Sequence, residues 1–199
     1  MKNLHLRILK TATSMFIIAL GIVAMMAADI GLNPWWTFST GLSELSGLSV
    51  GLVVQAMGLL FIVIAYLLGV KPGITTILDM ILVGLYVDLI RQVPLPVISH
   101  YSLQVLVLLI GLGLFCLGLS LTLTTGLGAG PKDSFTLALM KKTNSNINRM
   151  KLIVEGVIFI LGVLIGGPFG IGTIISTLFT GYILTYFFKL LRFDPKVAL

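Results

Sequence analysis

The chain has 199 residues, of which 57% are hydrophobic and 10% are charged, and its formal net charge is +6. Its mean hydropathy is +1.11, and soluble domains carry about 25% charged residues, so an ordinary soluble globule is excluded. The length suits one bundle, a single transmembrane domain over residues 1–199. The basic residues lie in short segments between apolar runs. This placement argues against nucleic-acid binding and favours a protein surrounded by membrane lipid.

Six apolar segments are long enough to cross a hydrocarbon core, which takes about 20 helical residues. The first segment follows basic residues, as a signal peptide does, but its apolar run is longer and further spans follow. We therefore expect it to remain as the first transmembrane helix. The predicted spans, in chain order, are Ile8–Ala28, Leu48–Val70, Gly73–Ile90, Ser102–Thr125, Ile147–Gly166 and Phe169–Leu190.

The orientation of these spans follows from their flanking lysines and arginines. If the N-terminus is cytoplasmic, only Arg91 falls on the outer side. The positive-inside rule therefore predicts that both termini are cytoplasmic. The basic residues then placed on the cytoplasmic side are Lys2, Arg7, Lys10, Lys71, Lys132, Lys141, Lys142, Arg149, Lys151, Lys189, Arg192 and Lys196.

The two halves of the chain match when the sequence is shifted by 97 positions without a gap, and the predicted repeats are residues 8–96 and residues 105–192. Each half holds three spans, so the second copy would enter the membrane from the opposite side. Such inverted repeats are typical of secondary transporters, although an old duplication kept only for its packing is the alternative. The matched pairs include Gly21 and Gly118, Pro34 and Pro131, Phe38 and Phe135, Gly73 and Gly170, and Thr76 and Thr173.

A short helical stretch lies between the first and second spans of each half. Asn33 and Gly130 stand at N-cap positions, and Pro34 and Pro131 stand at the first helical positions. A helix of about a dozen residues cannot cross a bilayer. Two interpretations remain open: interfacial helices anchored by tryptophan, or half-helices that present free N–H groups and a positive dipole end to a substrate. In the second case the substrate-binding residues would be Asn33, Pro34, Trp36, Thr37, Gly128, Gly130, Pro131, Asp133 and Ser134.

Acidic residues within the predicted spans are the candidate ion-coupling groups. An isolated carboxylate at membrane depth is costly and often marks an ion path, which makes Asp79 and Glu155 the candidates. The alternative for Glu155 is a salt bridge to Lys151, four residues earlier on the same helix face. Asp88 and Arg91 are three residues apart, and we expect a local ion pair between them.

The chain lacks the motifs of catalysis and of metal or nucleotide binding. Neither an HExxH, a GxSxG, a GxxxxGK[ST] nor a CxxC sequence occurs. Both histidines, His5 and His100, fall outside the predicted spans. We therefore expect no enzymatic activity, no metal site and no cofactor.

The glycine–proline stretches carry a resemblance to a known family. The stretch Gly126–Ser134, its weaker copy at Gly31–Thr37 and the six-span length resemble the YczE/YyaS/YitT family of bacterial integral membrane proteins. In the first copy Trp36 stands where the second copy has Asp133. The resemblance implies a multi-pass protein of the bacterial cytoplasmic (inner) membrane, often regarded as a transporter. The family's Gly-x-Gly-Pro-x-Asp pattern is kept by Gly128, Gly130, Pro131 and Asp133.

We expect no soluble C-terminal domain after Leu199, and this expectation favours the YczE-like branch of that family. The sequence as a whole predicts a small secondary transporter or exporter of an anionic or zwitterionic small molecule, coupled to protons. Positive helix ends favour negative charge, and no ATP-binding motif is present. Two alternatives remain. One is a non-transporting accessory or scaffold protein, as a homodimer or with a membrane-complex partner. The other is the substrate-capture subunit of an ATP-driven vitamin importer.

Overall fold

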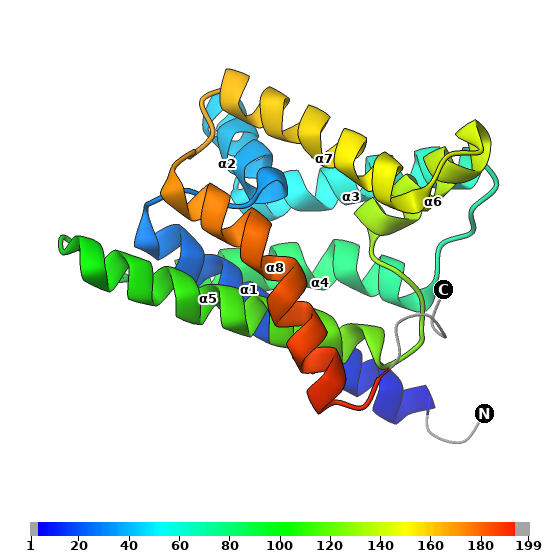
Figure 1. The fold of residues 1–199 in the computed structure, drawn as a ribbon, viewed down its shortest axis with the longest axis horizontal. Helices are drawn as coiled ribbons and strands as arrows, with labels where there is room; N and C mark the ends of the chain where they lie inside the picture. Colours follow the sequence, from blue (N-terminus) through cyan, green and yellow to red (C-terminus); the bar gives the residue numbers. More distant parts are fainter. Residues whose placement is uncertain (1–3, 194–199) are drawn as a thin grey trace.

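The computed structural model describes residues 4–193, which form eight α-helices and no β-strand. The predicted all-α class is confirmed. Lys2 and Lys196 of the predicted cytoplasmic set lie outside the described residues. The helices, drawn in Figure 1, are α1 (Leu4–Ala28), α2 (Pro34–Ser46), α3 (Val50–Leu67), α4 (Ile74–Arg91), α5 (Tyr101–Leu123), α6 (Pro131–Thr143), α7 (Ile147–Leu164) and α8 (Ile171–Leu190).

Four of these helices, α1, α3, α5 and α8, are long and apolar enough to cross a membrane. Helices α4 and α7 have 18 residues each, but each also carries three charged side chains. The six-span arrangement therefore stays a prediction. Figure 1 shows that α1, α3, α4, α5, α7 and α8 run in alternating directions along the molecule.

The short helices α2 and α6 begin as their sequences predict. The Asn33 side-chain oxygen accepts a hydrogen bond from the Trp36 N–H at 3.3 Å, and Pro34 follows as the first helical residue. In α6, Gly130 stands at the N-cap and Pro131 at the first helical position. Both prolines are buried, whereas the last residues of each helix are exposed. The N-terminal end of each short helix therefore points into the protein.

The helices pack in two groups (Figure 1). Helix α1 lies along α5 and also contacts α4, while α5 contacts α8. In the other group, α2 packs on α7 and α3 packs on α6. These pairs are related by the same 97-residue shift that relates the two halves of the sequence. The shift maps α1 with α4 onto α5 with α8, and α2 with α7 onto α6 with α3.

Two backbone hydrogen bonds repeat this relation in atomic detail. The Thr75 N–H donates to the Leu127 carbonyl at 3.2 Å, and the Gly172 N–H donates to the Ile30 carbonyl at 2.7 Å. Donors and acceptors in the two bonds are each 97 positions apart. Each bond ties the chain after one long helix to the first turn of another.

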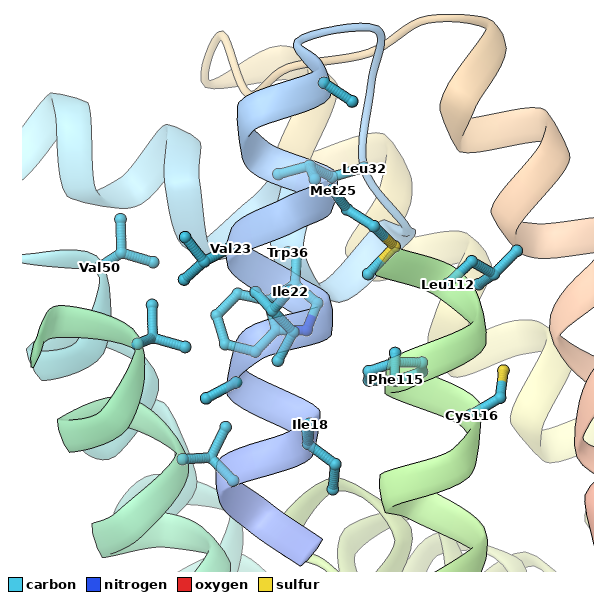
Figure 2. Close-up of a cluster of buried hydrophobic side chains, with 14 of the residues drawn as sticks. Ile18, Ile22, Val23, Met25, Leu32, Trp36, Val50, Leu112, Phe115 and Cys116 are labelled. Carbon is cyan, nitrogen blue, oxygen red and sulfur yellow. The ribbon is translucent and has the colours of Figure 1, made fainter. Parts of the chain in front are cut away.

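The core lies between α1, α4 and α5 and includes Trp36 from α2. Figure 2 shows Trp36 among Ile18, Ile22 and Phe115, all members of one buried cluster. Close helix contact depends on glycine: a Cβ added to Gly21 of α1 would lie 2.6 Å from the Gly111 carbonyl oxygen of α5. Small residues at such crossings let two backbones approach, as in membrane helix pairs.

Helices α3 and α4 are joined at the N-terminal end of α3. Asp88 accepts hydrogen bonds from the Ser49 hydroxyl at 2.5 Å and from the Gly51 N–H at 2.8 Å. The predicted ion pair between Asp88 and Arg91 is wrong, because the free N–H groups at the start of α3 are a better partner for the carboxylate. Gln55 adds a bond from its side-chain amide to the Ile81 carbonyl at 2.9 Å.

Candidate functional site

Two adjoining cavities lie where the short helices begin. The inner cavity has a volume of about 130 Å³ and is lined by residues of α1 to α6. The outer cavity has a volume of about 660 Å³ and extends to α7 and α8. The residues that line both cavities, and so join them, are Asn33, Trp35, Phe115, Leu119, Leu123, Gly128, Lys132 and Asp133.

The structure places most of the sequence-predicted binding residues on these walls. Thr37 and Ser134 are the exceptions, because neither lines a cavity and both are buried behind the wall. The Thr37 hydroxyl donates to the carbonyls of Leu32 and Pro168, which gives it a structural role. Pro34 and Glu155 line the outer cavity. The predicted residues on the inner wall are Asn33, Trp36, Asp79, Gly128, Gly130, Pro131 and Asp133.

Two carboxylates converge on the first turn of α6. A Cβ built on Gly130 would lie 2.5 Å from the Asp79 Oδ2 atom and 3.9 Å from the Asp133 Oδ2 atom. Asp79 comes from α4 and Asp133 from the first turn of α6. Within the described part of the chain, neither carboxylate has a salt bridge or a hydrogen bond from a side chain. Gly130 therefore leaves the space that the Asp79 carboxylate fills.

A cation and an aromatic wall face these carboxylates. The Lys132 Nζ atom lies 5.6 Å from the centre of the Trp35 ring, a cation–π arrangement. Trp35 also meets the Phe61 ring edge-on at 5.3 Å, and Phe61 stacks on Phe135 at 5.0 Å. These rings join α2, α3 and α6 around one side of the cavity.

Sequence reasoning missed Trp35 and Lys132 as site residues, although they are 97 positions apart and so occupy equivalent places in the two halves. The repeat register was the signal that could have identified them together. Phe61 carried no such signal, because its counterpart, Ile158, does not line either cavity.

Two polar atoms on the inner wall are buried without a hydrogen-bond partner. These are the Thr75 hydroxyl and the Trp35 Nε1–H group. Thr75 is 1% exposed and precedes Asp79 by one helical turn, so both lie on one face of α4. An unsatisfied buried polar atom costs about 1–3 kcal/mol. Such atoms beside a cavity mark a place where a bound molecule would complete the hydrogen bonding.

Glu155 lies on the outer cavity rather than beside Asp79. The alternative considered for Glu155, an ion pair with Lys151, is present, with a separation of 4.0 Å between Nζ and Oε1. Both side chains are partly exposed, so this pair contributes little to stability. Ser176, the counterpart of Asp79 in the second half, lines the outer cavity and donates to the Thr173 carbonyl at 3.1 Å. The carboxylate on α4 thus has no acidic counterpart on α8.

The outer cavity opens between α7 and α8, where the packing of α3 against α4 is not repeated. Gly84 of α4 lies against the Gly51 backbone and the Gln55 side chain of α3. Its counterpart in α8, Gly181, would meet nothing within 4 Å if it carried a Cβ. One helix pair is therefore closed and its counterpart is parted.

Comparison with known proteins gives a family but no chemistry. A family model described as a family of unknown function (DUF6198) matches residues 5–189. The chain is 31% identical over 174 residues to the uncharacterized membrane protein YczE of Bacillus subtilis, which covers 86% of this chain and 80% of that protein. It is 25% identical over 181 residues to an uncharacterized protein of Haemophilus influenzae, covering 91% and 83%. No solved structure matches the chain. The relatives and the apolar helices together indicate a membrane protein.

Proposed function

We propose that this chain, which belongs to the YczE-like DUF6198 family, is a small secondary transporter of the bacterial cytoplasmic membrane. The observation that carries the proposal is the meeting of both short-helix starts and Asp79 at the inner cavity, which adjoins the outer cavity between α7 and α8. Irregular backbone and half-helix ends at the centre of a bundle are typical of transporter sites.

The proposal includes six spans in two inverted repeats, with both termini in the cytoplasm. It is supported by the matched helix pairs and by the two matched backbone hydrogen bonds, Thr75 to Leu127 and Gly172 to Ile30. Helices α4 and α7 then complete the six spans. Their charged residues away from the helix ends face a partner helix or a cavity, as membrane helices require; these are Asp79, Asp88, Lys151 and Glu155. Arg91 and Arg149 are exposed at the end of α4 and in the first turn of α7. In this topology α2 and α6 are half-helices.

The same topology explains how a cargo would reach the site. The closed contact of α3 with α4 lies toward the extracytoplasmic side of the membrane. The parted helices α7 and α8, with the outer cavity between them, open toward the cytoplasm. Because the two pairs are repeat counterparts, exchange of their arrangements would close the cytoplasmic opening and create an extracytoplasmic one. Rocking of one repeat against the other about a central site is the usual form of alternating access. Asp79, at that site, is the proposed ion-coupling carboxylate.

Disulfide trapping tests this exchange without knowledge of the cargo. The Cβ of Met80 lies 3.4 Å from a Cβ built on Gly58, which suits a disulfide between α3 and α4. The counterparts of Gly58 and Met80 are Glu155 and Thr177, on opposite walls of the outer cavity. Both double-cysteine variants would be made in a background in which Cys116 is alanine.

We expect the Gly58→Cys/Met80→Cys pair to cross-link readily under mild oxidation in membranes. The Glu155→Cys/Thr177→Cys pair should cross-link more slowly, as the molecule visits the alternate state. A rigid scaffold would trap the first pair and never the second. Complete absence of the second disulfide, with the first one fully formed, would therefore contradict the transporter.

A further inference from the structure

We propose that the inner cavity binds the ammonium group of a small organic amine, held by Asp79, Asp133 and the Thr75 hydroxyl. This rests on the proposed function, because it names the cargo class of the same site. The first argument for an amine is the set of charged groups on the cavity wall. Two carboxylates and one ammonium, that of Lys132, line the inner cavity, so a second ammonium group bound with both carboxylates ionised would leave the site neutral.

The helix ends do not reverse this balance. The positive end of the α6 dipole is already complemented by Asp133 in its first turn and by Asp79 beside Gly130. Lys132 lies over the Trp35 ring and forms no salt bridge with a described residue. An incoming anion would face both carboxylates at short range, whereas an ammonium group would neutralise them.

The unpartnered Thr75 hydroxyl points to a ligand independently of the charges. It is buried on the cavity wall one turn from Asp79, and its oxygen can accept a hydrogen bond. Two carboxylates and this oxygen supply acceptors for the three N–H bonds of a primary ammonium group. The unpartnered Trp35 Nε1–H is a donor, so it suits an oxygen elsewhere on the same molecule.

The size and the walls restrict the amine further. A volume of about 130 Å³ is close to that of a cavity known to hold benzene, on the order of 150 Å³. The inner cavity therefore has room for about six non-hydrogen atoms of a bound molecule. Trp35 and Phe61 line it with aromatic faces and edges, and aromatic faces attract cations.

Tryptophan fluorescence of the purified full-length protein tests the proposal directly. The chain has two tryptophans, and both Trp35 and Trp36 line the inner cavity. Three probes of nearly equal size separate charge from shape: 3-aminopropan-1-ol is a cation, propane-1,3-diol is neutral, and 3-hydroxypropanoate is an anion. We expect a saturable fluorescence change with the amine, and a response at least tenfold weaker with the other two probes.

Variants identify the atoms involved. Asp133→Asn and Thr75→Val should each weaken amine binding several-fold. Thr40→Val is the matched control, because the Thr40 hydroxyl is also buried and unpartnered but does not line either cavity. Its affinity should equal that of the wild type. Size-exclusion profiles confirm that each variant is folded.

Three results would overturn the amine site. They are no saturable response to the amine, a stronger response to the anion, or wild-type affinity for the amine in the folded Thr75→Val and Asp133→Asn variants. The outcome is separable from that of the disulfide test. Amine binding without formation of the α7–α8 disulfide would keep this site and remove transport. The opposite result would keep transport and remove the amine.

Discussion

Gly130 shows how a single residue shapes the cavity. Its φ of −66° is open to any residue, so the backbone does not require glycine there. Its missing side chain makes room, because a Cβ would lie 2.5 Å from the Asp79 Oδ2 atom and the carboxylate would have to move. Glycine at this position therefore lets the carboxylate on α4 lie against the start of α6.

Gly130→Ala should accordingly displace the Asp79 carboxylate and weaken binding of 3-aminopropan-1-ol about tenfold, the equivalent of roughly 1.4 kcal/mol. Titration of the tryptophan fluorescence measures this. Gly113→Ala is the control, because a Cβ at Gly113 of α5 would meet nothing within 4 Å. Wild-type affinity in a folded Gly130→Ala variant would show that the position of Asp79 does not matter for binding.

At the scale of elements, the contrast between two helix pairs is the basis of the proposed alternating access. Asp88 of α4 accepts two hydrogen bonds from the start of α3 and holds that pair together. The residue 97 positions later in α8 is Thr185, whose hydroxyl donates to the Gly181 carbonyl of its own helix. The second pair thus lacks the carboxylate that closes the first.

Asp88→Ala should destabilise the protein by about 1–3 kcal/mol, because the Gly51 N–H loses its acceptor. Thermal unfolding in detergent gives the size of this effect. When combined with the Gly58→Cys/Met80→Cys pair, the variant should also lower the yield of the disulfide between these two cysteines, since α3 is no longer tied to α4. Glu44→Ala is the control, because Glu44 is exposed and surface changes stay within about 0.5 kcal/mol. Equal disulfide yields in both variants would contradict a closing role for Asp88.

At the scale of the whole molecule, the proposed topology places the ends of the two short helices on opposite sides of the membrane. Ser46 at the end of α2 and Thr143 at the end of α6 are 97 positions apart, and both are exposed. They serve as a matched pair, since their positions in the two repeats are equivalent.

In spheroplasts, Ser46→Cys should react with an impermeant maleimide, and Thr143→Cys should react only after the membrane is permeabilised. Both variants would again lack Cys116. Labelling of both cysteines from the same side would contradict the inverted repeat. The proposed exchange between the two helix pairs would then lose its geometric basis.

Local features of this molecule could be predicted from the sequence. The helices follow from apolar runs, and the starts of α2 and α6 follow from Asn33, Pro34, Gly130 and Pro131, because capping depends on neighbours in the chain. Most of the predicted binding residues do line the cavities. Thr37 and Ser134 do not line either cavity, because the direction of each side chain depends on the segments that pack against its helix.

The amino-acid sequence by itself determined the helical class, the membrane character and the 97-residue match between halves. Only the tertiary structure decided that Asp79 and Asp133 share one small space, and that Asp88 binds the start of α3 rather than Arg91. It alone also distinguished Gly84, packed against α3, from Gly181, which faces open space. The physical reason is that helix formation and capping act between residues close in the chain, whereas contacts between helices depend on how distant segments pack.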